Sequence, residues 1–118
     1  MIESIISMEL PAGGHLAVRR NRICPKQETK QCRRISLVSG IHGDELEGQY
    51  ICYETARRVK EHPEYLKGIV DIYPALNPLG IDMASRTVPR LDMDMNRMFP
   101  GDASGDMMER ITAAVVDS

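Results

Sequence analysis

The sequence predicts an α/β protein built on an open, mixed sheet with helices. Two short apolar runs, at 35–38 and 68–76, flank a segment with helical spacing at 45–61. This order is typical of a β-α-β unit with a right-handed crossover. Earlier in the chain, two strand-like runs enclose the turn sequence Pro-Ala-Gly-Gly at 11–14, which favours an N-terminal β-hairpin.

Composition limits the class of protein. The chain has 118 residues, a net charge of −2 and 27% charged residues, as in an ordinary soluble domain. It lacks an 18-residue apolar run and a basic segment leading into an apolar one, so we expect no membrane span and no signal peptide. The three cysteines do not form a Cys-x-x-Cys pair, which favours free thiols, a reducing compartment and a cytoplasmic location.

The hairpin strands are expected at 4–10 and 15–20. The segment that follows, 19–34, carries seven basic side chains against one acid, Glu28. A nucleic-acid surface would interleave aromatic side chains for base stacking, and this segment has none. We therefore expect a solvated loop between strands and no nucleic-acid partner.

The central run at 35–38 ends before Gly40 and is expected to be a buried parallel strand. The helix at 45–61 should end near Glu61, because Pro63 disfavours helix at the residue before it. A second strand is expected at 68–76. Ligands of such sheets bind beyond the carboxyl ends of the strands.

Two loops leave from that edge, at 40–45 and 76–101. The second is about 25 residues long without obvious structure, and loops of that length are usually functional or disordered. A final helix should begin at Asp106, which forms a capping box with Glu109. No strand follows this helix, so we expect the chain to be truncated.

The first loop contains a candidate metal site. His42 and Glu45 are three residues apart at the start of the expected helix, where both side chains can face one point. An imidazole and a carboxylate would supply two of the three protein ligands of a catalytic zinc site. Alternatively, Asp44 and Glu45 are acids favoured in a first helical turn.

Several motifs occur in a specific order and spacing from about residue 35 to the end: Gly40-x-His42-Gly43-x-Glu45, Asn77-Pro78, Arg86 and Asp94-x-Asn96-Arg97-x-Phe99-Pro100-Gly101. Together they resemble the succinylglutamate desuccinylase/aspartoacylase family of zinc carboxypeptidase-like hydrolases.

The resemblance implies a role for each matched polar residue. His42 and Glu45 correspond to the first two zinc ligands. Arg86 corresponds to the catalytic arginine that polarises the scissile carbonyl. The pair that binds the substrate carboxylate corresponds to Asn96 and Arg97, with Asp94 in support. A planar guanidinium suits both tasks, because it binds carboxylates bidentately and stabilises a developing negative oxygen.

Two parts of the family's site have no counterpart in this chain. The third zinc ligand, a histidine in an Asp-x-His motif, and the glutamate that acts as general base both come later in the family's sequences. The resemblance therefore implies that residues 1–118 are the N-terminal part of one zinc-hydrolase domain. Residues 1–34 would supply N-terminal strands and a basic loop, and 35–118 the family-matching part.

The implied function is zinc-dependent hydrolysis of the amide bond of N-acyl amino acids or related small molecules with a free carboxylate. The 118 residues alone should be inactive and hold zinc weakly. The alternative is a non-catalytic α/β fragment or interaction module that keeps the family motifs. Truncation should also expose a sheet edge and the apolar face of the last helix, which favours self-association as a homo-oligomer.

Overall fold

The computed structural model describes residues 1–27 and 32–118. In these ranges the elements are, in chain order, β1 (Ile2–Glu9), β2 (His15–Ile23), β3 (Arg34–Val38), α1 (Glu47–Glu61), β4 (Ile69–Tyr73), α2 (Pro78–Met83) and α3 (Met107–Asp117). Single 3-10 turns lie at Pro11–Gly13, Pro63–Tyr65 and Met95–Arg97. No helix among the described residues is long and apolar enough to cross a membrane.

The strands form one mixed sheet in the order β1-β2-β4-β3. β1 and β2 pair antiparallel, which confirms the N-terminal hairpin, and β2 continues antiparallel onto β4. β3 and β4 pair in parallel, with Val38 opposite Tyr73, which confirms the β-α-β unit. β2 extends beyond the predicted 15–20, because it pairs first with β1 and then with β4. β1 both begins and ends earlier than the predicted 4–10.

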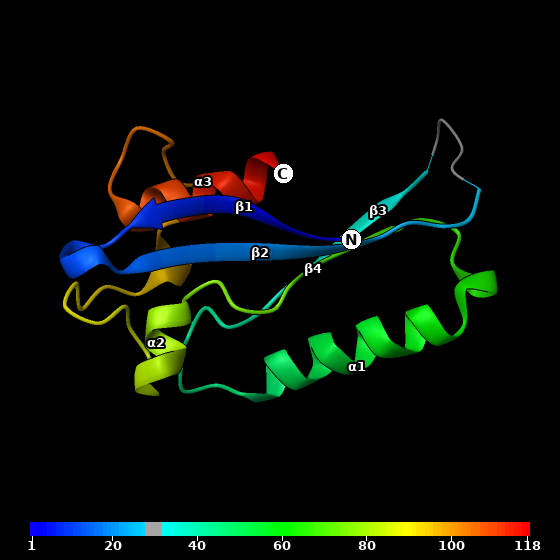
Figure 1. The fold of residues 1–118 in the computed structure, drawn as a ribbon, viewed down its shortest axis with the longest axis horizontal. Helices are drawn as coiled ribbons and strands as arrows, with labels where there is room; N and C mark the ends of the chain where they lie inside the picture. The colour runs from blue at the N-terminus through cyan, green and yellow to red at the C-terminus, as the bar shows by residue number, and fades with distance from the viewer. Residues whose placement is uncertain (28–31) are drawn as a thin grey trace.

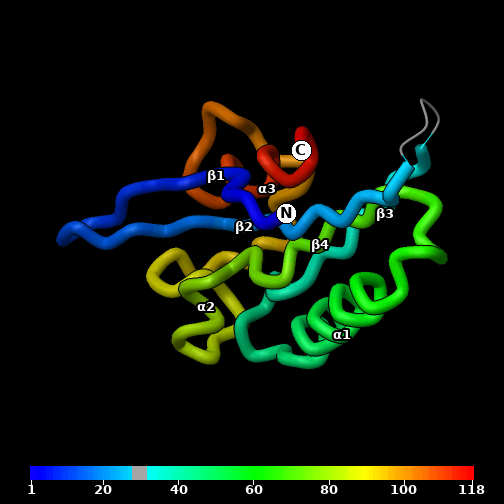
Figure 2. The backbone as a smooth tube through the Cα atoms, turned by 45° about the vertical axis from the view of Figure 1, so that its right-hand side comes forward, coloured from blue at the N-terminus to red at the C-terminus, as the bar shows by residue number. Residues whose placement is uncertain are grey.

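Helices cover the two faces of this sheet (Figures 1 and 2): α3 lies on one side and α1 on the other. The alternation of side chains along the strands therefore produces two cores. The core on the α3 side contains Met8, Leu16, Val18, Tyr73, Leu76, Val88, Met95, Met108 and Ile111. The smaller core, under α1, contains Cys52, Val70 and Ile72.

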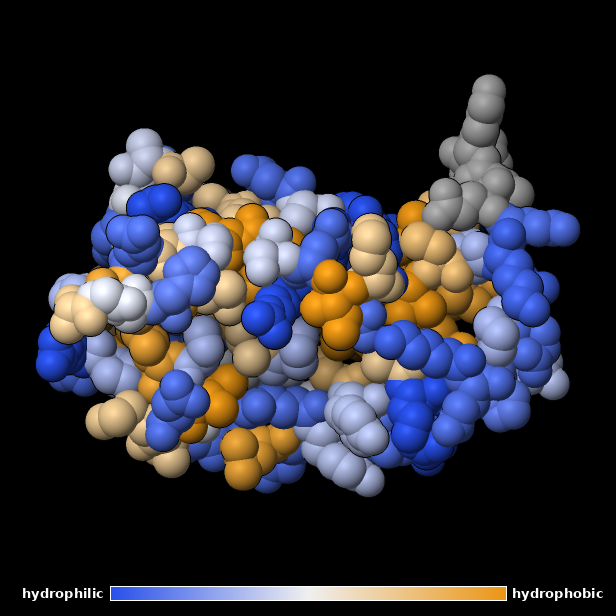
Figure 3. Space-filling model, viewed as in Figure 1, coloured by the Kyte–Doolittle hydropathy of each residue, from blue (hydrophilic) through white to orange (hydrophobic). Residues whose placement is uncertain are grey.

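The outer side of α1 carries ion pairs beside three exposed large side chains, Tyr50, Ile51 and Tyr53. Arg57 forms ion pairs with Glu54 and Glu61 at the (i, i+3) and (i, i+4) spacings of one helical face. Figure 3 shows polar and charged side chains gathered over this helix. The helix predicted from the spacing at 45–61 is confirmed, and it packs against the sheet through Cys52 and Ala56.

The prediction of a buried strand at 35–38 was wrong in one respect. β3 is at the edge of the sheet, and Ile35 is 57% exposed. A run of apolar residues is typical of a strand covered on both faces, but α1 and β4 cover β3 only in part. An exposed sheet edge was expected, and β3 provides one. Self-association through this edge stays a prediction.

Two other boundaries differ from the sequence-based expectation. α1 begins at Glu47 rather than at residue 45, so His42 and Glu45 lie in the turn before the helix. The loop 76–101 is not without structure, because it contains α2 and the turn Met95–Arg97. Asn77 and Asp94 cap these short elements with their side chains.

The last helix forms as predicted. Asp106 and Glu109 make a complete capping box. The expectation that the apolar face of this helix would be exposed was wrong: Met108 and Ile111 are buried against the sheet.

The solvated basic loop expected at 19–34 was wrong for residues 19–23, which belong to β2, whereas 24–27 and 32–33 do connect β2 with β3; residues 28–31 lie outside the described part. Arg20 and Arg22 belong to β2 and point toward Asp71 of β4, whose side chain is fully buried. Arg22 donates two hydrogen bonds of 2.7 Å to this carboxylate. Arg34 lies 3.9 Å from it, and Arg20 also pairs with Glu3.

The carbonyl oxygen of Ser118 accepts hydrogen bonds from the same three arginines, at 2.6, 3.3 and 2.9 Å. The end of α3 is thereby attached to the sheet. Burial alone would raise the pKa of Asp71, but the hydrogen bond from Arg22 and the charges of the three arginines outweigh it, so this pKa lies below its ordinary value.

We expect Asp71→Asn to lower the free energy of unfolding by about 3–5 kcal/mol at pH 7, because it leaves buried guanidinium groups without their carboxylate. The folded-state pKa of Asp71 is depressed, so its contribution is present above about pH 4 and is lost as the pH falls through the folded pKa. The difference between the parent and the variant should therefore shrink in acid.

Urea denaturation at pH 7 and pH 3 measures both effects. The exposed Asp82 on α2 offers a matched control, since Asp82→Asn should change stability little at either pH. Equal stability of the parent and Asp71→Asn at pH 7 would show that the arginines do not depend on this carboxylate.

Candidate functional site

The ends of the two parallel strands bring two loops together. Beyond β3, the backbone N–H of Ser39 donates to the Tyr73 carbonyl oxygen at 2.9 Å. Beyond β4, Asn77 N–H donates to the Gly40 oxygen at 2.8 Å. The chain after Gly40 carries His42, and the chain after Asn77 carries Arg86, so the predicted edge of the sheet is where the candidate residues meet.

Two glycines make this approach possible. Gly40 has φ +66, and a Cβ there would lie 2.9 Å from the Pro74 oxygen. At Gly43 a Cβ would lie only 2.0 Å from the carbonyl carbon of Gly80 in α2. The His42 loop, residues 40–45, therefore packs backbone against backbone on the start of α2.

The imidazole of His42 is held between two carboxylates. Its Nδ1 lies 3.2 Å from Glu45 Oε1, and its Nε2 lies 2.9 Å from Asp94 Oδ1. The side chain of His42 is only 11% exposed. The expected convergence of His42 and Glu45 is thus present, but it arises in a turn closed by Glu45 N–H and the His42 oxygen rather than in a helix.

The number of protons that the His42 ring can carry fits a site for a cation between the ring and Glu45. A neutral imidazole carries one N–H and can donate to only one carboxylate. If Nε2–H donates to Asp94, Nδ1 presents a lone pair toward Glu45, which is also an acceptor. Both contacts are favourable only if the ring is doubly protonated or if a cation lies between Nδ1 and Glu45.

Asp94 is the centre of the polar contacts. Besides His42 it accepts the backbone N–H of Asn96 at 3.0 Å. The guanidinium of Arg86 lies 3.9 Å from Asp94 and 3.4 Å from Glu45. The hydrogen bond with His42 outweighs partial burial and, with the Asn96 amide and the nearby Arg86, holds the pKa of Asp94 below its ordinary value.

The structure brings together four of the six candidate residues: His42, Glu45, Arg86 and Asp94. Asn96 lines the same pocket as His42 and Glu45. Arg97 lies at the margin, with its side chain 85% exposed and its Nε 4.0 Å from Asp94. It is therefore the least constrained of the six.

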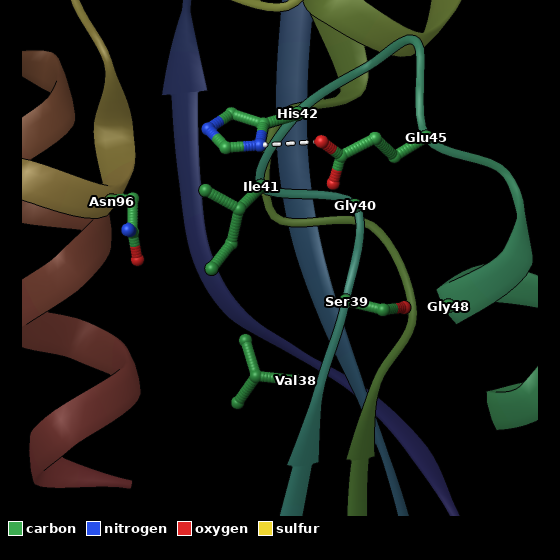
Figure 4. Close-up of a pocket in the computed structure, with 8 residues that line it drawn as sticks. All are labelled: Val38, Ser39, Gly40, Ile41, His42, Glu45, Gly48 and Asn96. Carbon is green, nitrogen blue, oxygen red and sulfur yellow. Dashed lines mark hydrogen bonds and ion pairs between the residues drawn. The ribbon is translucent and has the colours of Figure 1, made fainter.

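The pocket at this edge has a volume of about 280 Å³. Figure 4 shows the His42 ring and the Glu45 carboxylate facing each other, with Asn96 across from the ring on a separate segment. Val38 and Ile41 add apolar surface to the lining. A small polar molecule with a short apolar part would fit these dimensions and this chemistry.

Among residues 1–27 and 32–118, no group of three or more His, Cys, Asp and Glu side chains has the arrangement of a metal site. Within the described residues, His42 and Glu45 are the two facing side chains that could contribute to a metal site. Asp94 lies on the far nitrogen of the same ring, where a carboxylate could orient the imidazole.

Asn77, for which the sequence suggested no role, is a buried polar residue beside the site. Its side chain is hydrogen-bonded to both loops. An asparagine immediately before Pro78 is a recognisable N-cap signal, but its contacts across the loops could not be read from spacing.

Comparisons with known proteins agree with this geometry. The family model described as the succinylglutamate desuccinylase/aspartoacylase catalytic domain matches residues 31–117. An N-alpha-acetyl-L-2,4-diaminobutyric acid deacetylase of Halomonas elongata is 36% identical over 75 residues, which are 64% of this chain and 21% of that protein.

Two solved structures extend the agreement to the fold. A succinylglutamate desuccinylase/aspartoacylase from Rhodobacter sphaeroides has a TM-score of 0.70 and 31% identity over 86% of this chain and 29% of its own. An aspartoacylase family protein from Mesorhizobium loti has a TM-score of 0.72 and 27% identity, over 92% of this chain and 33% of its own.

The chain therefore spans a third or less of the length of these relatives. The family match covers most of it, including every candidate site residue. The chain belongs to the succinylglutamate desuccinylase/aspartoacylase family.

Proposed function

We propose that this chain carries the first part of the active site of a zinc-dependent amidohydrolase that removes the acyl group from small N-acyl amino acids. The observation that supports it most is the contact of one imidazole with two carboxylates, next to an arginine that reaches both. The deacetylase relative from Halomonas elongata supports the same type of reaction.

In this proposal zinc would be held by His42, whose Nδ1 faces Glu45, and by Glu45 itself. The metal would supply a Lewis acid and lower the pKa of its bound water. Catalytic zinc typically has three protein ligands. Since the match covers only a third or less of these relatives, we propose that the third ligand and the general base lie beyond residue 118.

Asp94 fixes the tautomer of His42. Its carboxylate, 2.9 Å from Nε2, holds the ring proton on that nitrogen and leaves the lone pair on Nδ1 directed toward Glu45. Because its pKa is depressed, Asp94 stays ionised at neutral pH and keeps accepting this proton.

Arg86 and the pair Asn96–Arg97 divide the recognition of substrate. Arg86 lies beside Glu45, where its charge can polarise a carbonyl next to the metal site. Asn96 faces the pocket and Arg97 is exposed at its margin, so together they can bind the free carboxylate of an N-acyl amino acid.

The first test removes a ligand. His42→Ala in the full-length protein should reduce bound zinc from about one per chain to nearly none, because catalytic zinc depends on each of its three protein ligands. Mass spectrometry of the metal content measures the zinc bound per chain, and circular dichroism checks that the variant is folded. His62→Ala, at the exposed far end of α1, should keep the metal, and full zinc content in folded His42→Ala would refute the assignment.

A second test concerns orientation of the ligand. Asp94→Asn keeps the shape of the side chain but removes its charge, and loss of such an outer carboxylate typically weakens metal binding by about 10–100-fold. Competition with a chelator gives the zinc dissociation constant. The nearby exposed Asp92 provides the control variant Asp92→Asn, and equal affinities in the two variants would contradict the role of Asp94.

The third test separates the arginines. Arg86→Ala should lower kcat by about 100- to 1,000-fold, because charge on the carbonyl oxygen develops only in the transition state. Arg97→Ala should instead raise KM by about 10-fold, since it removes binding that is present before and during the reaction.

Steady-state kinetics of the full-length protein on N-acyl amino acids gives both parameters. Arg110→Ala on the exposed side of α3 is the control and should change neither. A similar change in kcat and KM at Arg86 and Arg97 would mean that the division of roles is wrong.

A further inference from the structure

The side chain of Asn77 is buried between the two loops that carry the site. Only 1% of the residue is exposed. Its Oδ1 accepts the backbone N–H of Gly80 at 2.8 Å, which caps α2. Its Nδ2 donates at 3.3 Å to the carbonyl oxygen of Ile41 and at 3.3 Å to that of Thr87.

These two acceptors are adjacent in sequence to the site residues. Ile41 immediately precedes His42, and Thr87 immediately follows Arg86. One amide group therefore connects the backbone beside the proposed zinc ligand with the backbone beside the proposed carbonyl-polarising arginine. Both N–H bonds of Nδ2 are used, which is the full donor capacity of an asparagine.

Helix capping alone does not account for this arrangement. A cap needs only the side-chain oxygen, and serine or aspartate would serve equally well. The two bonds of Nδ2 do nothing for α2. They hold carbonyl groups of two different loops at one buried amide, and loss of a buried hydrogen-bond donor costs stability at the acceptors it served.

A backbone contact completes the connection. Gly43 N–H donates to the Ser85 oxygen at 2.9 Å, and the Ser85 hydroxyl donates to the Thr87 oxygen at 2.7 Å. The His42 loop and the residues 85–87, which we call the Arg86 segment, are thus joined both through Asn77 and directly.

We propose that Asn77 is a positioning residue that sets the distance between His42 and Arg86. This inference rests on the proposed function for its catalytic consequence, but the mechanical connection can be tested without it. Catalysis is sensitive to such a distance, since a displacement of about 1 Å can cost about 100-fold in rate.

The experiment replaces Asn77 by serine in the full-length protein. Asn77→Ser keeps a capping oxygen for α2 and removes both Nδ2 donors. We expect amide hydrogen exchange at Gly43 to become at least about 10-fold faster as its loop separates from the Arg86 segment, while protection in α1 and α3 is unchanged. Zinc affinity should fall by about 10-fold, and kcat should fall with little change in KM.

The control is a core variant with a similar loss of melting temperature, Ile111→Ala in α3. It should leave Gly43 exchange, zinc affinity and kcat as in the parent. If Asn77→Ser and Ile111→Ala give the same Gly43 exchange, zinc affinity and kcat, Asn77 is only a helix cap and the proposal is overturned.

A measurement on the unmodified protein covers the case in which Asn77→Ser does not fold. The two side-chain amide protons of Asn77 should exchange far more slowly than those of the exposed Asn96; equal rates would overturn the proposal. If the parent binds no zinc and hydrolyses no amide, the proposed function fails. Slow Asn77 exchange and faster Gly43 exchange in Asn77→Ser would in that case still support the connection between the loops.

Discussion

The parallel pairing of β3 with β4 determines where every candidate residue lies. The two strands end side by side, with Val38 opposite Tyr73, so the chain leaves both at one edge of the sheet. Loops after parallel strands meet there because both strands point the same way. Glu45 and Arg86 are 41 residues apart in sequence, yet their side chains lie within 3.4 Å.

The charged clusters around Asp71 and around His42 differ in their ratio of cationic to anionic groups. Around Asp71 three arginines surround one buried carboxylate, and the excess positive charge is shared with the Ser118 oxygen. Around His42 the balance is reversed, because two carboxylates contact one imidazole. The first cluster is internally satisfied and holds α3 on the sheet. The second includes the guanidinium of Arg86 beside both carboxylates, but a neutral imidazole can donate to only one of them.

Local patterns were sufficient to predict the hairpin, the β-α-β unit, the capping box at Asp106 and the convergence of His42 with Glu45. The errors have a common physical cause, which is that exposure depends on neighbours distant in sequence. Apolar spacing at 35–38 could not show that β3 is an edge strand. Arg20 and Arg22 were expected to be solvated because their partner, Asp71, follows much later in the chain. The hydrogen bonds of Asn77 to Ile41 and Thr87 could not be predicted for the same reason.

The precision of the site depends on backbone contacts more than on side-chain packing. Gly43 lies so close to Gly80 that a single added carbon would overlap it, and a polypeptide backbone cannot adjust by changing rotamers as a side chain does. The distance between the His42 loop and α2 is therefore nearly fixed once the sheet has formed. Arg97, at the exposed margin, has no such constraint. This difference agrees with the proposed roles, in which His42 needs a fixed geometry, whereas Arg97 can move to meet a substrate carboxylate.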